Sequence, residues 1–133
     1  MIQTSVFGDR VPGVYYLSDF NNGELEDVLF ILYAMCHSAE INATYGNFLT
    51  MSQNKGVDNA IGFRDDISNS KAIYWNNRFW YHTNNNYNLY SAAYVATYET
   101  ALYPPITGNY SGLESWVLAG NWQTKLEPAR YGN

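Results

Sequence analysis

Between residues 72 and 98 the chain carries aromatic runs that Asn residues interrupt, and this segment constrains the fold more than any other. Aromatic side chains pack well on the pleated surface of a sheet, whereas Asn tolerates the left-handed backbone of a tight turn. The pair Asn76-Asn77 and the stretch Asn84 to Asn86 therefore predict turns between strands. With a two-residue turn at Asn76-Asn77, Tyr74 would face Phe79 across a hairpin. The segment predicts a β-meander.

Other segments also indicate strands. A Pro-Gly turn at residues 12–13 separates two short apolar runs, residues 41–51 alternate loosely, and residues 113–122 resemble a last strand with a bend. We therefore predict a mainly β fold, a sandwich or small barrel built around the aromatic meander. A chain of 133 residues fits one domain with a real core. We expect that domain to span residues 1–122, followed by an extended C-terminal arm at 123–133.

Residues 22–38 permit two interpretations. Asn21 with Glu24 three positions later suits a helix capping pair, and acids in a first turn favour the helix dipole. In contrast, the apolar run from Val28 to Tyr33 is bounded and rich in β-branched and aromatic residues, which fits a strand buried on both faces. We slightly favour one short helix over residues 22–38.

The composition narrows the classes of partner. Only 14% of residues are charged, the net charge is −5, and seven Lys and Arg are scattered along the chain. Nucleic-acid backbones and anionic membranes require clustered basic residues, so we expect neither nucleic-acid binding nor membrane insertion. The N-terminus shows no signal-peptide pattern, and we expect folding in the cytosol. Thirteen Tyr and sixteen Asn favour neutral contacts with a subunit or a sugar.

Candidate catalytic groups are sparse in the sequence. Asp65 and Asp66 are adjacent, and adjacent carboxylates usually point apart, so a solvated turn is the better interpretation. Cys36 precedes His37 directly, but neighbouring residues rarely achieve the geometry that activates a thiol. His82 lies far from His37 and no zinc-type spacing is present. We therefore expect no enzyme activity, no cofactor and no metal. A hydrolase using Asp65, Asp66 or Cys36 is the third and weakest alternative.

Aromatic and amide side chains are the stronger candidates for a binding surface. Indole and phenol rings stack on sugars, and Asn amides supply hydrogen bonds to hydroxyls. The alternative is that the rings fill a sheet core and a subunit contact, and both uses can coexist. The predicted glycan or partner surface comprises Trp75, Asn76, Asn77, Trp80, Tyr81, Asn85, Tyr87 and Tyr90.

The spacing of several short motifs resembles an aromatic-rich surface module of phage virion and tail proteins and of some bacterial extracellular proteins. The residues that carry this resemblance are Asn42-Ala43-Thr44-Tyr45, Ile73-Tyr74-Trp75, Trp80, Leu89-Tyr90-Ser91 and Pro104 to Tyr110. They cover roughly half of the chain. In the module Gly stands where this chain has Ala43, and Trp stands where it has Tyr110, with Asn109 inserted before it.

The resemblance implies a non-enzymatic β-rich protein displayed on a particle or cell surface. On that basis we expect a structural or attachment protein of a bacteriophage-like virion, assembled in the host cytoplasm, as a capsid decoration, tail or tail-fibre component. Its expected partners are copies of itself, with a trimer favoured, other virion proteins and a host surface glycan. The alternative is a free carbohydrate-binding, lectin-like module.

Overall fold

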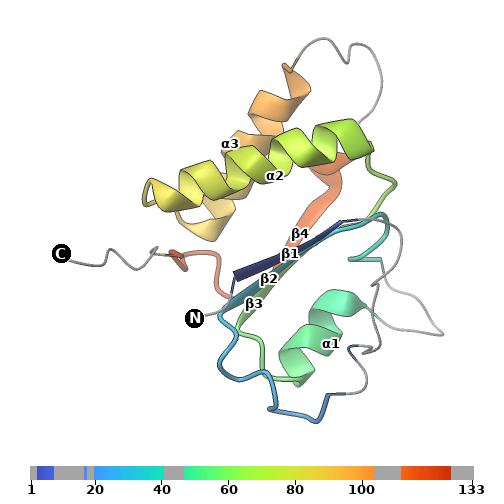
Figure 1. Cartoon of the computed structure of the whole chain (residues 1–133), viewed down its shortest axis with the longest axis vertical. Coiled ribbons are helices and arrows are strands. Elements are labelled where there is room, and N and C mark those ends of the chain that lie inside the picture. The colour runs from blue at the N-terminus through green and yellow to red at the C-terminus, as the bar shows by residue number, and fades with distance from the viewer. Residues whose placement is uncertain (1–2, 8–16, 18–19, 41–46, 104–111, 127–133) are drawn as a thin grey trace.

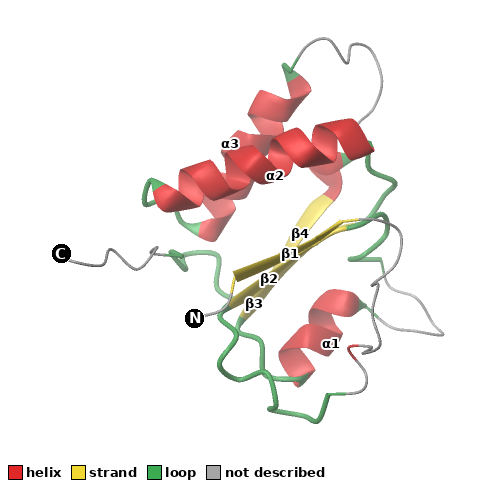
Figure 2. Ribbon diagram, viewed as in Figure 1, coloured by secondary structure: helices red, strands yellow, loops and turns green. Residues whose placement is uncertain are grey.

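A mixed sheet lies between one short helix on one face and two longer helices on the other (Figures 1 and 2). This arrangement is seen in a computed structural model that describes residues 3–7, 17, 20–40, 47–103 and 112–126. Helices of 7, 16 and 13 residues accompany strands of only four or five residues, so the predicted mainly β sandwich or barrel is wrong. The described residues form three layers, helix on sheet on helices.

The sheet has four strands in the order β1-β2-β3-β4. β1, β2 and β3 run parallel, while β4 runs antiparallel to β3. Their bounds are Gln3–Phe7 for β1, Phe30–Ala34 for β2, Asn59–Phe63 for β3 and Trp116–Ala119 for β4. Since β2 and β3 are parallel, their carboxyl ends meet at the same edge of the sheet.

Both central strands are buried along their whole length. On β2, Phe30 and Leu32 pack toward the two long helices, whereas Ile31 and Tyr33 pack toward the short helix. A strand covered on both faces needs apolar side chains at every position, which explains the unbroken run in the sequence. The helix expected over residues 22–38 is therefore wrong, and the alternative, a strand buried on both faces, is confirmed.

The short helix α1 (Phe48–Asn54) connects β2 to β3 and covers one face of the sheet (Figure 1). Its N-cap is Asn47, whose side-chain oxygen accepts the backbone N–H of Leu49 at 2.7 Å. Leu49 is buried beneath the sheet, and the hydroxyls of Tyr33 and Ser52 lie 2.6 Å apart. Part of the segment predicted as a strand at residues 41–51 is thus helical, and residues 41–46 lie outside the described part.

The predicted meander is a pair of helices, α2 (Asn69–Asn84) and α3 (Leu89–Ala101). Trp75 and Phe79 are one helical turn apart, and their rings stack at 5.2 Å against the sheet. The strand prediction failed because the buried positions follow the helical period, and burial against a sheet overrides the weak β preference of aromatic residues. The pair Asn76-Asn77 lies inside α2, so no hairpin turn forms there.

A turn does occur where the Asn stretch predicts one, although it joins helices. Asn86 has a left-handed backbone with φ of 71°, which Asn tolerates better than most residues. Asn88 then caps α3 by accepting the backbone N–H of Ser91 at 2.8 Å. The amide-rich composition therefore encodes helix ends as well as turns.

Polar side chains tie α2 to α3. The Arg78 Nε donates to a carboxylate oxygen of Glu99 at 2.9 Å, and the His82 ring contacts the other oxygen. Burial raises the pKa of Glu99, but the hydrogen bonds and charges of these two partners outweigh it and hold the pKa below the ordinary value of 4.5. The indole of Trp75 also donates to the hydroxyl of Thr97 at 2.9 Å.

The chain after β4 returns to the helical layer. Lys125 pairs with Asn88, and Leu126 is completely buried in the core beneath α3. Residues 127–133 of the expected C-terminal arm lie outside the described part, as do the Pro-Gly turn at 12–13 and the motif from Pro104 to Tyr110.

Two substitutions at Asn77 distinguish a helix from a hairpin, because the order of their stabilities is opposite in the two structures. In the interior of α2, Asn77→Ala should be more stable than Asn77→Gly by about 1 kcal/mol, because Gly is a poor helix former. In a two-residue turn that requires a positive φ, the order would reverse. Urea unfolding of both variants measures the difference, and a more stable Gly variant would contradict the helix.

The tie between the helices should make stability sensitive to acid. We expect Glu99→Gln to lower the free energy of unfolding at pH 7 by about 1–2 kcal/mol, because charge-assisted hydrogen bonds are lost. Since the folded-state pKa of Glu99 is lowered, its contribution is full above the unfolded-state pKa and is lost as the pH falls through the folded-state value. The difference between wild type and variant should therefore shrink as the pH falls below the unfolded-state pKa and through the folded-state pKa of Glu99. Exposed Glu26→Gln is the control for the removal of one carboxylate.

Candidate functional site

Several residues of the predicted binding surface serve the core. Trp75 is completely buried, and Trp80 is partly buried against Phe30, with ring centroids 5.8 Å apart. Asn76 accepts the indole N–H of Trp80 at 3.1 Å, so its amide oxygen is already engaged. Asn77 is exposed on α2. The indole rings of Trp75 and Trp80 thus hold α2 on the sheet in this structure.

The remaining predicted residues are more accessible. Tyr81 is exposed beneath the Arg78 guanidinium, 4.4 Å from its ring centroid, and Asn85 donates to the Tyr81 carbonyl. Tyr87 and Tyr90 are exposed and line an open depression of about 280 Å³ beside α3. A larger open pocket of about 510 Å³ adjoins it and is lined by Tyr90, Trp116, Leu118, Gly120 and Trp122.

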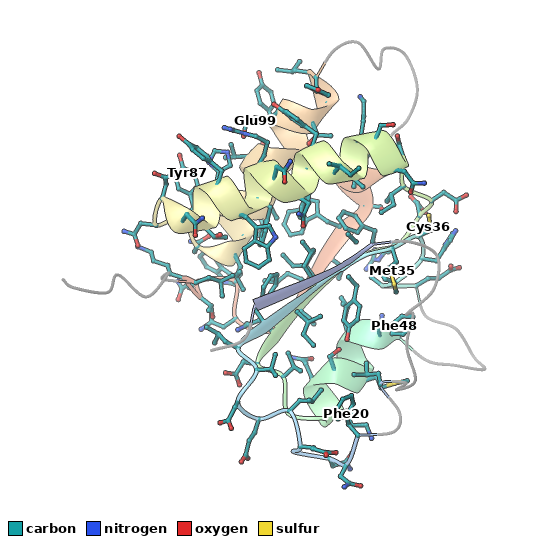
Figure 3. The ribbon with its side chains drawn as sticks, in the orientation of Figure 1. Phe20, Met35, Cys36, Phe48, Tyr87 and Glu99 are labelled. Carbon is teal, nitrogen blue, oxygen red and sulfur yellow. The ribbon has the colours of Figure 1, made fainter. Side chains whose placement is uncertain are left out.

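A second group of functional side chains gathers at the carboxyl edge of the parallel strands. Cys36 and His37 follow β2, while Asp65 and Asp66 follow β3. In open α/β sheets this edge is where ligands generally bind, because the loops after the strands converge there. Figure 3 shows Cys36 at this end of the sheet and Tyr87 at the opposite end of the helical layer. The two candidate sites are therefore separate.

The turn after β2 is fastened to β3 by Ser38. Its buried hydroxyl donates to backbone carbonyls at 3.0 Å and accepts the backbone N–H of Phe63 at 2.9 Å. A β-carbon on Gly62 would lie 2.7 Å from the Ser38 hydroxyl oxygen, so only glycine permits this approach. The turn carrying Cys36 and His37 is consequently fixed to the neighbouring strand.

The turn after β3 is fixed from the side of β4. The backbone N–H of Asp65 donates to the hydroxyl of Ser115 at 3.1 Å. Gly112 has φ of 77°, and a β-carbon there would lie 1.7 Å from the carbonyl oxygen of Asp66. Glycine is therefore required at residue 112 both for its backbone angle and for the close approach of the two loops.

His37 joins the two turns. Its Nε2 lies 2.8 Å from Oδ1 of Asp66, and its Nδ1 lies 2.6 Å from Oε2 of Glu40. The backbone φ is 56°, a conformation that costs on the order of 1 kcal/mol in residues other than glycine. Partial burial lowers the pKa of His37, but the hydrogen bond to Asp66 and the negative charges of Glu40 and Asp66 raise it overall. The two carboxylates therefore favour the protonated form of the ring.

Cys36 is half-buried and precedes His37 directly, and its sulfur contacts the turn after β3. The backbone N–H of Ile67 donates to Sγ at 3.3 Å, and the thiol donates to the carbonyl of the same residue at 3.8 Å. The thiol is therefore positioned by both turns.

Other groups of titratable side chains are weaker candidates. His82 is occupied by Glu99 within the helical layer. Within the described ranges no three His, Cys, Asp or Glu residues are placed to hold a metal ion. In the same part of the chain, no helix combines the length and the apolar character that crossing a membrane requires. Among the described residues, the carboxyl edge is where a thiol, an imidazole and carboxylates meet.

The sequence does contain a signal for this edge, although it is not visible when adjacent residues such as Cys36 and His37 are considered only as pairs. Two bounded apolar runs, Phe30–Ala34 and Asn59–Phe63, are each followed directly by groups capable of chemistry. If both runs are interpreted as parallel strands, the carboxyl-edge rule places Cys36 near Asp66 although 30 residues separate them. Comparison of the chain with family models, curated proteins and solved structures found no match.

Removing the partner of His37 should change its titration. We expect Asp66→Asn to lower the pKa of His37, because the variant loses a hydrogen bond and a charge that favour the imidazolium. An NMR pH titration of the ring protons measures this, and His37→Gln assigns the signal among the two histidines. Asp58→Asn, at the opposite end of β3, is the control. An unchanged pKa in Asp66→Asn would contradict the contact.

Proposed function

We propose that the protein is a thiol-dependent hydrolase acting on acyl substrates at the carboxyl edge of the sheet. The observation that carries this proposal is the convergence of Cys36 and His37 from one turn with Asp66 and Ile67 from another. The strained backbone of His37 supports it, because such strain gathers at functional sites. The proposal concerns residues that the sequence favoured least, since adjacency alone gave no reason to expect an active thiol.

The chemistry follows from the contacts. The thiolate of Cys36 would attack the carbonyl carbon of an amide or ester, forming a carbon–sulfur bond as the carbon–nitrogen or carbon–oxygen bond breaks. The departing group needs a proton, which His37 can supply once its ring releases one of the two carboxylates that it contacts. Water then hydrolyses the thioester, returns a proton to the ring and restores the thiol. Asp66 and Glu40 orient the ring and favour its protonated form.

The charges around the thiol favour a class of substrate. The carboxylates of Glu40 and Asp66 lie at the site, and the same turns carry a third acid, Asp65, against the basic residues Arg64 and His37. A substrate with a positive charge next to the scissile bond would be attracted, and an acidic one would be repelled. Peptide amides with Lys or Arg beside the scissile bond are therefore the preferred test substrates.

The virion role, the host-glycan partner and the lectin-like alternative stay predictions. The resemblance that led to them implied a β-rich protein, whereas the described residues form three α-helices around a small sheet. The motif at Ile73 to Trp75 and that at Leu89 to Ser91 lie in α2 and α3, and two further motifs lie outside the described residues. The geometry of the carboxyl edge supports the hydrolase more directly.

The reactivity of the thiol tests the proposal. Cys36 is the single cysteine, so alkylation by iodoacetamide reports on it alone. We expect wild type at pH 7 to react faster than a free cysteine peptide, and His37→Gln to lose most of this excess, because the variant lacks the basic ring that the proposal pairs with the thiol. His82→Gln is the histidine-matched control and should keep the wild-type rate, with circular dichroism verifying its fold.

Substrate capture provides the second measurement. Incubation with activated esters and with Arg or Glu peptide amides should give an acyl adduct on wild type by mass spectrometry and none on Cys36→Ala. Turnover of the Arg peptide should exceed that of the Glu peptide. The proposal fails if Cys36 reacts as an ordinary thiol in both wild type and His37→Gln, and no acyl adduct forms.

A further inference from the structure

β4 forms one end of the sheet, and within the described ranges no segment pairs with its outer side. The strand pairs with β3 in a register that places Phe63 opposite Trp116 and Ile61 opposite Leu118. The backbone N–H of Arg64 donates to the carbonyl of Ser115 just before the strand. Because hydrogen-bonded and non-bonded pairs alternate in antiparallel strands, Trp116 and Leu118 occupy non-bonded positions. Their N–H and C=O groups therefore point away from β3, along the open edge.

The surface beside this edge is aromatic and open. Trp122 and Tyr90 are exposed, and with Trp116 and Leu118 they line the pocket of about 510 Å³. The ring of Tyr90 meets that of Trp116 at 5.4 Å and 70°, and it meets that of Trp122 at 6.1 Å and 73°. Tyr94 continues the exposed surface one turn further along α3, at 6.3 Å from Tyr90.

The same region carries no charge. Residues 116–124 contain no Asp, Glu, Lys or Arg, although the protein has a net charge of −5. The one acid of α3, Glu99, is paired with the Arg78 guanidinium and also contacts the ring of His82. Two copies of an acidic protein repel each other over most of their surfaces, and this edge is a place where they can approach without opposed carboxylates.

We propose that the edge of β4 with its aromatic pocket, formed by Tyr90, Trp116, Leu118 and Trp122, binds a second copy of this chain. The two β4 strands would pair antiparallel across a two-fold axis and continue the sheet from one copy into the other. In the register centred on Val117, Trp116 of one copy faces Leu118 of the other, and all the outward amides and carbonyls of both residues are satisfied.

A second copy fits this edge because an antiparallel strand pair is self-complementary. Proteins usually protect an open edge with a charge, a proline or a bulge. β4 is short but carries none of these, and its register with β3 is regular. Burying Trp122 and Tyr90 removes exposed aromatic surface at the same time as the backbone groups are paired.

Light scattering of the purified chain across a concentration series tests the proposal. We expect the mass to rise from 15.2 kDa to twice that value, with no larger species. Trp122→Lys, which replaces an exposed ring of the aromatic pocket with a hydrated charge in each copy, should remain at the lower mass over the same range. Ile73→Lys introduces the same charge at an exposed apolar position of α2 and should dimerise like wild type.

Amide exchange locates the contact residue by residue. By NMR, the amides of Trp116 and Leu118 should become protected at high concentration, whereas that of Val117, which already faces β3, should be protected at both concentrations. A monomer at every concentration overturns the proposal. A trimer also overturns it, because pairing of the two β4 edges leaves no third edge of this kind to bind another copy. A dimer in which Trp116 and Leu118 remain unprotected, or one that Trp122→Lys does not disrupt, places the contact elsewhere and equally overturns it.

Discussion

The fold depends on the burial of β2 on both faces. Phe30 and Leu32 require cover on one side and Ile31 and Tyr33 on the other, so neither a single layer of helices nor a second sheet on one side would suffice. α1 supplies one cover, and α2 with α3 supplies the other (Figure 2). With β2 central and β3 parallel to it, the turns that follow the two strands must lie side by side, and the candidate site is a consequence of that placement.

The sequence predicted β2 only as an alternative, because a short apolar run fits a buried strand and a buried helix equally well. The larger error concerned residues 72–98, where aromatic content was given more weight than spacing. Trp75 and Phe79 are four residues apart, and Leu89, Ala92, Ala93 and Ala96 follow the same period. A run of alanines at helical spacing, alternating with exposed tyrosines at residues 90, 94 and 98, is the pattern of a helix packed closely on a neighbour.

The candidate site could be predicted only once the strands were placed. Cys36 and His37 are visible as a pair, but the groups that position them, Asp66 and Ile67, come from a turn about 30 residues away. The need for glycine at residue 112 likewise becomes visible only once the strands are placed. Nothing in the sequence around Gly112 indicates that the Asp66 carbonyl occupies the space of a β-carbon there, because that approach is set by the packing of β4 against β3.

The double contact of His37 has a consequence for the spacing of the two turns. A protonated ring offers an N–H on each nitrogen, and Glu40 and Asp66 use both. A neutral ring keeps one N–H and turns the other nitrogen into an acceptor, which a carboxylate cannot satisfy. The second ring proton therefore connects the loops after β2 and β3. Without it, the ring can donate a hydrogen bond to Glu40 in its own turn or to Asp66 in the neighbouring one, but not to both.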